Sequence, residues 1–520
     1  MSAVTLPARS AEGPRGPRIP TVLRLSAGRL LRLELRRSTM MWMVPLALLA
    51  FWLDTYRSSM ALPALWGSRT LILRQGMAVD DFAPFVVGAA AWIGGRDRRR
   101  GIGEQVDSTP LPRWAGRTAA WAASTGWAVG TYLACVGFLY AVIAWQGAAG
   151  SPPWWPLPVG AMALAACSAV GFAIGVLVPS RFTAPLAAIV TALVLRQTLR
   201  SGGRYVLLSP MVSPAYSLSP PRADAGVFYP YLPDLSITQL LFLGGLTVAA
   251  VGMLGVQAVC GGRGLRRLAA SVVAVGLALS GTGVALIGTA RVEAKGVVVP
   301  ALHDAADDRP VAYTPVCGGA GVQVCLNPVY RAYLPTVTAA LAPLLREVAG
   351  LPGAPVRVDQ VDLSEQHAVL AGAVVAGDPP VARLALNIGY DGAMWIGPGA
   401  PGSARASCCT SQQLWSSVPR VTEQVLPPVA AAVVDHLVGH ADQAQQAVSA
   451  GLLTASGVPL DSLAVFAQLD GVTSTTPQPG SPAYLAGARF AALPAAARHA
   501  WLTAHFAELR AGALTLEQLP

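Results

Sequence analysis

The chain has 520 residues, of which 53% are hydrophobic and 12% charged, and its formal net charge is +10. Soluble domains carry about 25% charged residues, so this composition argues against an ordinary soluble protein and indicates a membrane protein. Lys295 is the sole lysine and lies in EAKGVV, so the chain lacks the glycine-lysine motif of a P-loop ATPase. The arginines gather at the edges of apolar runs and not along one polar face, so membrane topology explains them better than a nucleic-acid surface does.

The first 38 residues predict a cytoplasmic tail followed by a surface helix. The opening 20 residues are rich in Pro, Gly and Arg and lack the apolar core of a signal peptide, so we expect the N-terminus in the cytoplasm. In TVLRLSAGRLLRLELRR, leucines alternate with Arg29, Arg32 and Arg36. This spacing is typical of a basic amphipathic helix on anionic lipid. A plain extension of the first span is the alternative.

Apolar runs long enough to cross a bilayer predict about seven membrane spans. They lie at 39–56, 78–95, 118–144, 157–178, 182–197, 237–260 and 270–290. The first, second and fifth runs are short or contain Pro45, Pro84 or Pro185, so a count of six or eight stays open.

Arginine bias predicts the orientation of these spans in the plasma membrane. Arginines before the first span, at 96–100 and at 263–267 fall on one side if there are seven spans, and such loops stay in the cytoplasm. An odd count places everything after about residue 291 outside. We therefore predict an all-α polytopic bundle, N-terminus inside, followed by an extracytoplasmic α+β domain.

The predicted domains are a six-span region at 39–260, a cytoplasmic turn with the seventh span at 261–291, and the outer domain at 292–520. The last region contains all six histidines. Its alternating runs at 356–363 and 382–389 predict strands. The segments 330–350, closed by Gly350, and 421–440 predict helices.

The cysteines of the outer region predict disulfides, since an exported domain folds in an oxidising compartment. They are Cys317, Cys325, Cys408 and Cys409. The segment CGGAGVQVC closes easily as a hairpin, which favours a Cys317–Cys325 bond and leaves Cys408 and Cys409 as a strained vicinal pair. Cross-pairing of Cys408 and Cys409 with Cys317 and Cys325 is the alternative.

The third, fourth, sixth and seventh runs have no charged residue or histidine in their interiors, so a proton pathway is not expected and active transport requires an external energy source. Gly126 and Gly130, like Gly171 and Gly175, are spaced for close helix approach. We expect these pairs to pack helices within one chain, with a dimer contact as the alternative.

The charged stretch GGRDRRRGIGEQVDSTPLPRWAGR, residues 94–117, lies between the second and third spans. It resembles the cytoplasmic loop in membrane subunits of type-2 ABC exporters, whose pattern is an Arg/Glu-rich turn, Gly-Thr-x-Glu, two apolar residues and Ser/Thr-Pro-Val-x-Arg. The matching residues are Arg100, Gly101, Glu104, Val106, Ser108, Thr109, Pro110 and Arg113. Ile102 replaces the threonine and Gln105 one apolar residue.

This resemblance implies a short coupling helix that docks on a separate cytoplasmic ATPase, which holds ATP and Mg; the chain itself needs no cofactor and is not an enzyme. The implied coupling residues are Arg96, Arg98, Arg99, Arg100, Gly101, Glu104, Asp107, Pro110 and Arg113. It also implies a homodimer, or a heterodimer with a second permease. Charge-assisted contacts of Glu104 and the arginines suit such docking. The alternative is that the arginines only retain the loop inside.

The outer domain is distantly similar to zinc-aminopeptidase-like domains fused to some exporter-like chains. His436 and His440 are four residues apart on a predicted helix, as in H-E-x-x-H, but Leu437 replaces the catalytic glutamate. We therefore expect neither peptidase activity nor a metal site. The rival function is a membrane-anchored outer domain that binds a ligand or is a degenerate peptidase.

Overall fold

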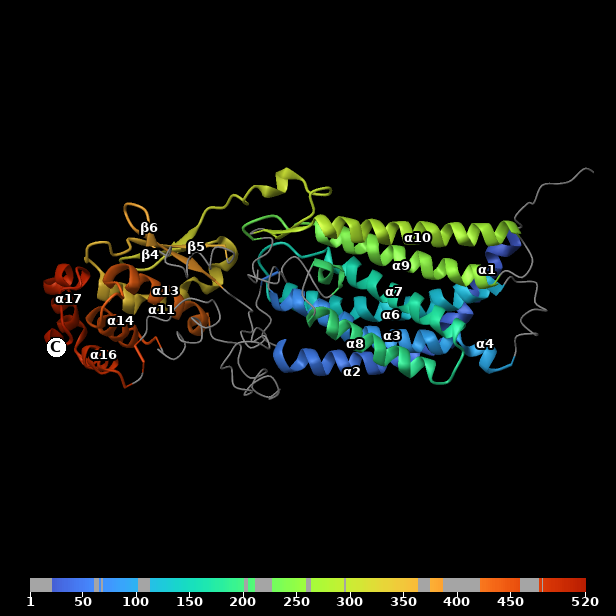
Figure 1. The fold of residues 1–520 in the computed structure, drawn as a ribbon, viewed down its shortest axis with the longest axis horizontal. Helices are drawn as coiled ribbons and strands as arrows, with labels where there is room; N and C mark the ends of the chain where they lie inside the picture. Colours follow the sequence, from blue (N-terminus) through green and yellow to red (C-terminus); the bar gives the residue numbers. More distant parts are fainter. Residues whose placement is uncertain are drawn as a thin grey trace, which may run out of the picture.

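The protein is described by a computed structural model that covers residues 21–59, 65–66, 69–101, 113–200, 204–210, 227–258, 263–293, 296–362, 375–386, 421–458, 477–478 and 480–520. It is elongated, with a helix bundle at one end and an α+β domain at the other (Figure 1).

Every predicted apolar run coincides with a helix of the bundle. The helices are α1 (Thr21–Arg37), α2 (Met40–Ser59), α3 (Arg69–Gly94), α4 (Arg96–Arg99), α6 (Arg113–Trp145), α7 (Pro156–Leu177), α8 (Thr183–Arg200), α9 (Asp234–Ala258) and α10 (Arg263–Thr289). A short 3-10 helix, η1, spans Arg204–Leu208.

Among the described residues, four helices are long and apolar enough to cross a membrane: Arg113–Trp145, Pro156–Leu177, Asp234–Val256 and Arg266–Thr289. The apolar parts of α2 and α8 are shorter, at Met40–Leu53 and Thr183–Leu195. The helical membrane part is therefore present, whereas the structure supports four spans and leaves seven as a hypothesis.

Glycines bring α3 and α7 into backbone contact. A Cβ added to Gly171 would collide with the carbonyl oxygen of Val87, and one added to Gly175 with that of Ala91. Only glycine allows two helix backbones to approach this closely. In this structure Gly171 and Gly175 therefore lie at a close approach of two helices of the same chain.

The glycine pair of α6 behaves differently. A Cβ on Gly126 would lie 3.7 Å from Leu35 Cδ2, which is ordinary contact with α1, whereas one on Gly130 would have nothing within 4 Å among the described residues. Gly130 is exposed on this chain, so its role in helix packing stays a prediction.

A five-stranded sheet organises the second domain. Its strands are β3 (Val316–Gly318), β4 (Gln323–Leu326), β5 (Arg357–Val361), β6 (Val375–Ala376) and β7 (Val381–Ala385), in the order β3-β4-β5-β7-β6. β4, β5 and β7 are parallel, and the outer strands β3 and β6 are antiparallel to their neighbours. The predicted strands at 356–363 and 382–389 correspond to β5 and β7.

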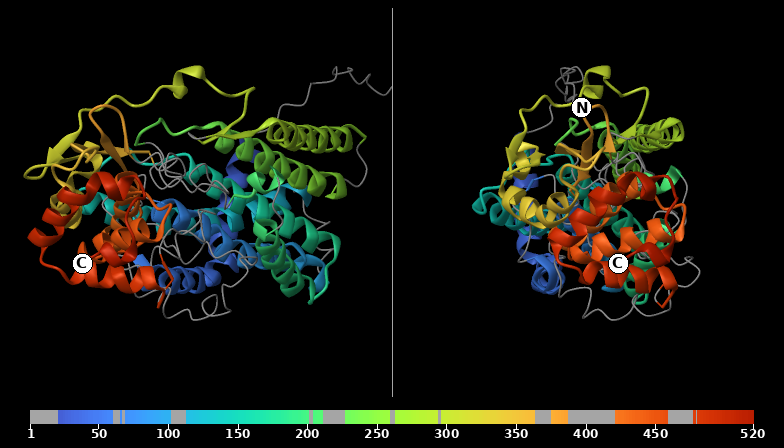
Figure 2. Two further views of the ribbon diagram at one scale, coloured as in Figure 1. Left: turned by 60° about the vertical axis from the view of Figure 1, so that its left-hand side comes forward. Right: turned by 90° about the vertical axis from the view of Figure 1, so that its left-hand side faces the viewer.

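Helices α11 (Leu334–Val348) and α13 (Val421–Val438) pack against one side of this sheet. Further helices pack on these two and on one another: α14 (Gln443–Ala455), α16 (Pro482–Ala492) and α17 (Ala495–Arg510), with 3-10 turns η3 (Pro328–Tyr333) and η7 (Leu516–Gln518). Figures 1 and 2 show the yellow and orange strands beside the orange and red helices. Gly350, at φ +80°, follows α11 as predicted. Its left-handed backbone suits glycine at a helix end.

The core of the α+β domain lies between the sheet and these helices. Val358, Ala382 and Leu384 alternate along their strands and are fully buried against helix residues such as Leu341 and Val433. This alternation places the intervening strand residues on the opposite face of the sheet.

A connector joins the bundle to this domain. It contains the antiparallel strands β1 (Arg291–Glu293) and β2 (Gly296–Val298) and the 3-10 turn η2 (Ala305–Asp308). Val311 N donates to Phe228 O at 2.8 Å, and the Phe228 and Tyr313 rings meet edge to face. The connector is therefore fixed to the segment that precedes α9.

Candidate coupling site

The short helix α4 begins the charged stretch directly after α3. Gly95 separates the two helices, and Gly101 follows at φ +67°, a backbone conformation that favours glycine. Figure 1 shows α4 and α1 at the end of the bundle far from the α+β domain.

Arg96 of α4 forms a bidentate ion pair with Glu34 of α1. Its Nη2 and Nη1 donate to the two carboxylate oxygens at 2.6 and 2.9 Å. The Arg96 side chain is 31% exposed and that of Glu34 14% exposed. The hydrogen bonds to Glu34 raise the pKa of Arg96, so this guanidinium is held charged.

α1 is also fastened to α6. Trp127 Nε1 donates to the Leu35 carbonyl oxygen at 2.8 Å, and the Leu35 side chain lies against Gly126. Residues 21–37 therefore form a helix that is fastened to the bundle and links the beginning of the charged stretch to α6. Its position on a membrane surface stays a prediction.

The arginines of α4 and of its C-cap, Arg100, fall into two groups. Arg99 lies with its guanidinium carbon 4.0 Å from the centre of the Trp92 ring and donates to the Trp92 carbonyl oxygen. Burial, and then the charge of Arg100, lower the pKa of Arg99. Arg98 and Arg100 are exposed. Arg96 and Arg99 thus anchor α4, and the exposed pair points to solvent.

The rest of the expected coupling loop lies outside the described residues. Glu104, Asp107 and Pro110 fall within 102–112, so their arrangement and the expected coupling helix remain predictions. Arg113 begins α6 and is half-buried.

A second polar cluster, which the sequence did not indicate, lies where the connector meets α9. Asp234, the first residue of α9, is fully buried; its Oδ2 accepts from Val299 N at 2.9 Å and lies 3.2 Å from His303 Nδ1. His303 Nε2 lies 2.6 Å from Asp308 Oδ1. His303 therefore bridges a buried carboxylate and an exposed one. His303 and Asp234 are 69 residues apart in the chain, so no local pattern indicates this contact.

The structure contains the favoured disulfide. Cys317 and Cys325 are bonded and pair across the β3–β4 hairpin. Cys408 and Cys409 lie outside the described residues.

The two histidines compared with a zinc motif do not share a helix. α13 ends at Val438, and Gly439 turns the chain at φ +83°, so the prediction that His440 belongs to this helix is wrong. His440 Nδ1 lies 3.0 Å from Asp435 Oδ1. Burial and the charge of Arg510 lower the pKa of His436. Within the described part of the chain, no group of three His, Cys, Asp or Glu residues is placed to hold a metal ion.

Comparisons with protein-family models, with curated proteins and with solved structures each find no match for the chain. Its function is therefore argued from its own residues.

Proposed function

We propose that this chain is the membrane subunit of an ATP-driven ABC exporter in the plasma membrane, coupled through the loop at 96–113 to a separate cytoplasmic ATPase. The ATPase would hold ATP and Mg, and two membrane subunits, identical or similar, would form the transport unit. The observation that carries the proposal is the ion pair between Arg96 and Glu34.

Coupling requires a loop that moves as one body with the helices it drives. Arg96 ties α4 to α1, and Trp127 ties α1 to α6. The loop runs from α4 to the first residue of α6, so both of its ends are connected to the same helices. A force applied to the loop would then reach α3, α6 and α1 together.

Charge distribution supports a docking role for the exposed side of α4. Arg98 and Arg100 are exposed beside the anchored Arg96 and Arg99. Retention of a loop in the cytoplasm needs positive charge alone and does not require a bidentate partner such as Glu34. The fastened arrangement therefore favours transmission of movement over simple retention.

The proposed orientation follows from the two ends of the molecule. α4 and the arginine-rich α1 lie at one end of the bundle, and the α+β domain with its disulfide lies at the other (Figure 1). A disulfide suits an oxidising compartment and the arginines suit the cytoplasm. The α+β domain would accordingly be extracytoplasmic.

Purification of the tagged full-length chain from native membranes in mild detergent tests the proposal. We expect a P-loop ATPase to copurify and its ATP hydrolysis to depend on the loop. Charge reversal at Glu104 or Arg100 should lower hydrolysis or transport severalfold while the chain stays folded. The exposed Arg331 of the α+β domain, changed to Glu, is the matched control.

The rival function, a membrane-anchored binding domain without transport, predicts a different result. In that case no ATPase copurifies and the loop variants change nothing. Either outcome alone would contradict the coupling role. Without an ATPase the loop has no energy source, and loop variants without effect would mean that the loop does not transmit its energy.

A further inference from the structure

The histidine that joins the connector to α9 contacts a carboxylate through each of its two ring nitrogens. His303 Nδ1 lies 3.2 Å from Asp234 Oδ2, and Nε2 lies 2.6 Å from Asp308 Oδ1. An ionised carboxylate only accepts hydrogen bonds, and a neutral imidazole carries a single N–H. With a neutral ring, one of the two contacts would therefore bring two acceptors together. The arrangement needs one proton more than a neutral imidazole and two carboxylates supply.

The burial of Asp234 gives this additional proton an electrostatic role. The Asp234 side chain is fully buried, whereas that of His303 is 12% exposed. Oδ2 also accepts from Val299 N, and Oδ1 is buried without a hydrogen-bond partner among the described residues. A buried charge is costly unless an opposite charge compensates it. A protonated ring beside Asp234 supplies that compensation.

Other charged residues lie on the segments around the ring. Leu302, the residue before the histidine, packs with η1, the end of α10 and β2. The charged residues of η1 and of the connector, besides His303 and Asp308, include Arg204, Arg291, Glu293, Asp304, Asp307 and Arg309. Asp304 Oδ1 accepts from Ala306 N, and Arg204 Nη1 donates to the Gly288 carbonyl oxygen. Three of the six are acids and three are arginines, so the two carboxylates in contact with the ring dominate its surroundings.

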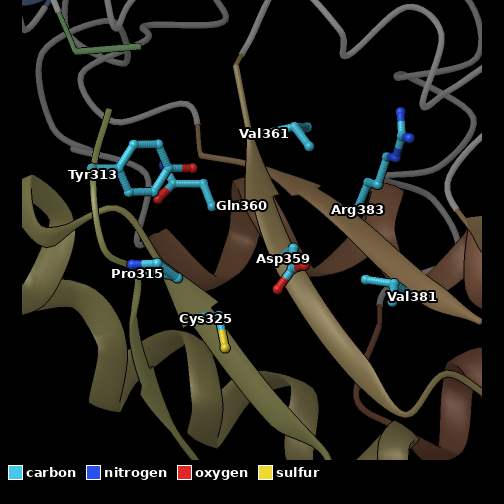
Figure 3. A pocket seen from close by; sticks show the side chains of 8 residues that line it. All are labelled: Tyr313, Pro315, Cys325, Asp359, Gln360, Val361, Val381 and Arg383. Carbon is cyan, nitrogen blue, oxygen red and sulfur yellow. The ribbon is translucent and has the colours of Figure 1, made fainter. Parts of the chain in front are cut away.

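These contacts lie at the bundle end of the connector, and the connector continues to the α+β domain. Asp234 is the first residue of α9, whereas His303 belongs to the connector. Farther along, Tyr313 of the connector lines a pocket beside the sheet residue Asp359 (Figure 3). The contacts of His303 therefore help to set how firmly the α+β domain is tied to α9.

We propose that His303, Asp234 and Asp308 form a pH-sensitive switch, the His303 cluster. At low pH the cluster holds the additional proton, and the connector is closed on α9. At higher pH the proton is lost, one contact becomes a meeting of two acceptors, and the connector opens at this point. In the proposed orientation the cluster responds to the pH outside the cytoplasm, and this last point alone rests on the proposed function.

Hydrogen exchange of the purified full-length chain in detergent, measured between about pH 5 and pH 8, tests the proposal. Protection factors of residues 299–308, corrected for the intrinsic exchange rate at each pH, report opening of the connector. An imidazole released from both carboxylates titrates at about pH 6.5. Closing then takes up a proton above that pH, so protection should fall by up to about tenfold per pH unit. Amides of β4 and β5 are the internal reference and should change much less.

Two variants separate the proton from the fold. Asp308→Asn gives the ring an amide that can donate to a neutral nitrogen, so no additional proton is needed and the pH dependence should disappear. His303→Gln removes the titrating ring, so protection should be about tenfold lower at low pH and independent of pH. Asp307→Asn, which changes the neighbouring aspartate of η2, is the matched control and should keep the full pH dependence.

Constant protection of residues 299–308 across the pH series in the unchanged chain overturns the proposal, and this measurement needs no variant to fold. A pH dependence that survives in His303→Gln or in Asp308→Asn also overturns it, because a different group would then titrate. None of these measurements requires an ATPase or a transport substrate, so failure here leaves the coupling role intact.

Discussion

Arg96 holds both carboxylate oxygens of Glu34, at 2.6 and 2.9 Å, although 62 residues separate them in the chain. The pair joins α4 to α1 at the end of the bundle where the charged loop begins. We expect this pair to contribute little to the stability of the fold but to be needed for coupling.

Glu34→Gln should uncouple the loop without unfolding the chain. The pair is partly exposed, so its contribution to stability is about 1 kcal/mol or less. We expect the thermal midpoint in detergent to change little while ATP hydrolysis by the copurified complex responds less to transport substrate, by severalfold.

The control for this variant is Arg98→Gln, which changes an exposed arginine of the same short helix. The swapped double variant, Glu34→Arg with Arg96→Glu, should restore part of the coupling. Full coupling in Glu34→Gln would contradict the proposal that α1 transmits movement of the loop to the bundle.

Gly175→Val should separate α3 from α7. A Cβ at this position collides with the Ala91 carbonyl oxygen, which is backbone and cannot move aside. Overpacking of this kind costs about 1–3 kcal/mol or more. We expect a lower thermal midpoint and a lower yield of monodisperse protein by size-exclusion chromatography.

Gly130→Val on α6 is the matched control, because a Cβ there has nothing within 4 Å. This Gly→Val substitution should then leave the thermal midpoint and the monodisperse yield of the monomeric chain nearly unchanged. A loss equal to that of Gly175→Val would show that the exposed side of α6 is covered in the assembled protein.

Features set by local sequence could be predicted. The apolar runs located the helices of the bundle, and period-two alternation located β5 and β7, because both are local properties of the chain. The Cys317–Cys325 bond was favoured for the same reason, since its two cysteines belong to one hairpin. Gly439 was a local signal that the prediction overlooked, so the helix was extended to His440.

Long-range pairings could not be read in this way. Glu34 gives no local sign of a partner near residue 96, and Asp234 gives none of His303. The glycines of a small-xxx-small pair likewise contact another helix only where the fold places one beside them, and the spacing alone does not show this.

His303→Ala should loosen the connector between α10 and the α+β domain. His303 bridges the buried Asp234 and the exposed Asp308, and Asp234 also accepts from Val299 N. We expect amide hydrogen exchange in residues 299–308 to rise about tenfold, since local openings report the contacts that close a segment.

His505→Ala is the matched control, because His505 contacts the Glu508 carboxylate and the Trp501 ring within its own helix, far from the connector in the chain. Exchange in 299–308 should be unaltered by it. If His303→Ala also leaves that exchange unaltered, the bonds of Asp234 to the backbone hold the connector without the imidazole.

Arg498→Met should destabilise the α+β domain more than any surface change. Arg498 of α17 and Glu347 of α11 form an ion pair whose side chains are 8% and 7% exposed, and Arg498 Nε donates to Glu347 Oε2 at 3.0 Å. Removal of the arginine leaves a buried carboxylate without its partner, which costs about 3–5 kcal/mol. Hydrogen exchange of residues 495–510 in the full-length chain measures the loss.

The double variant Arg498→Met with Glu347→Leu separates charge from packing. It removes both ions, and buried ion pairs replaced by apolar side chains often cost little, so most of the stability should return. Some loss should remain, because Arg498 also donates to the carbonyl oxygens of Ala491 and Leu493. A double variant as unstable as Arg498→Met would show that these carbonyl contacts, and not the ion pair, attach α17 to the domain.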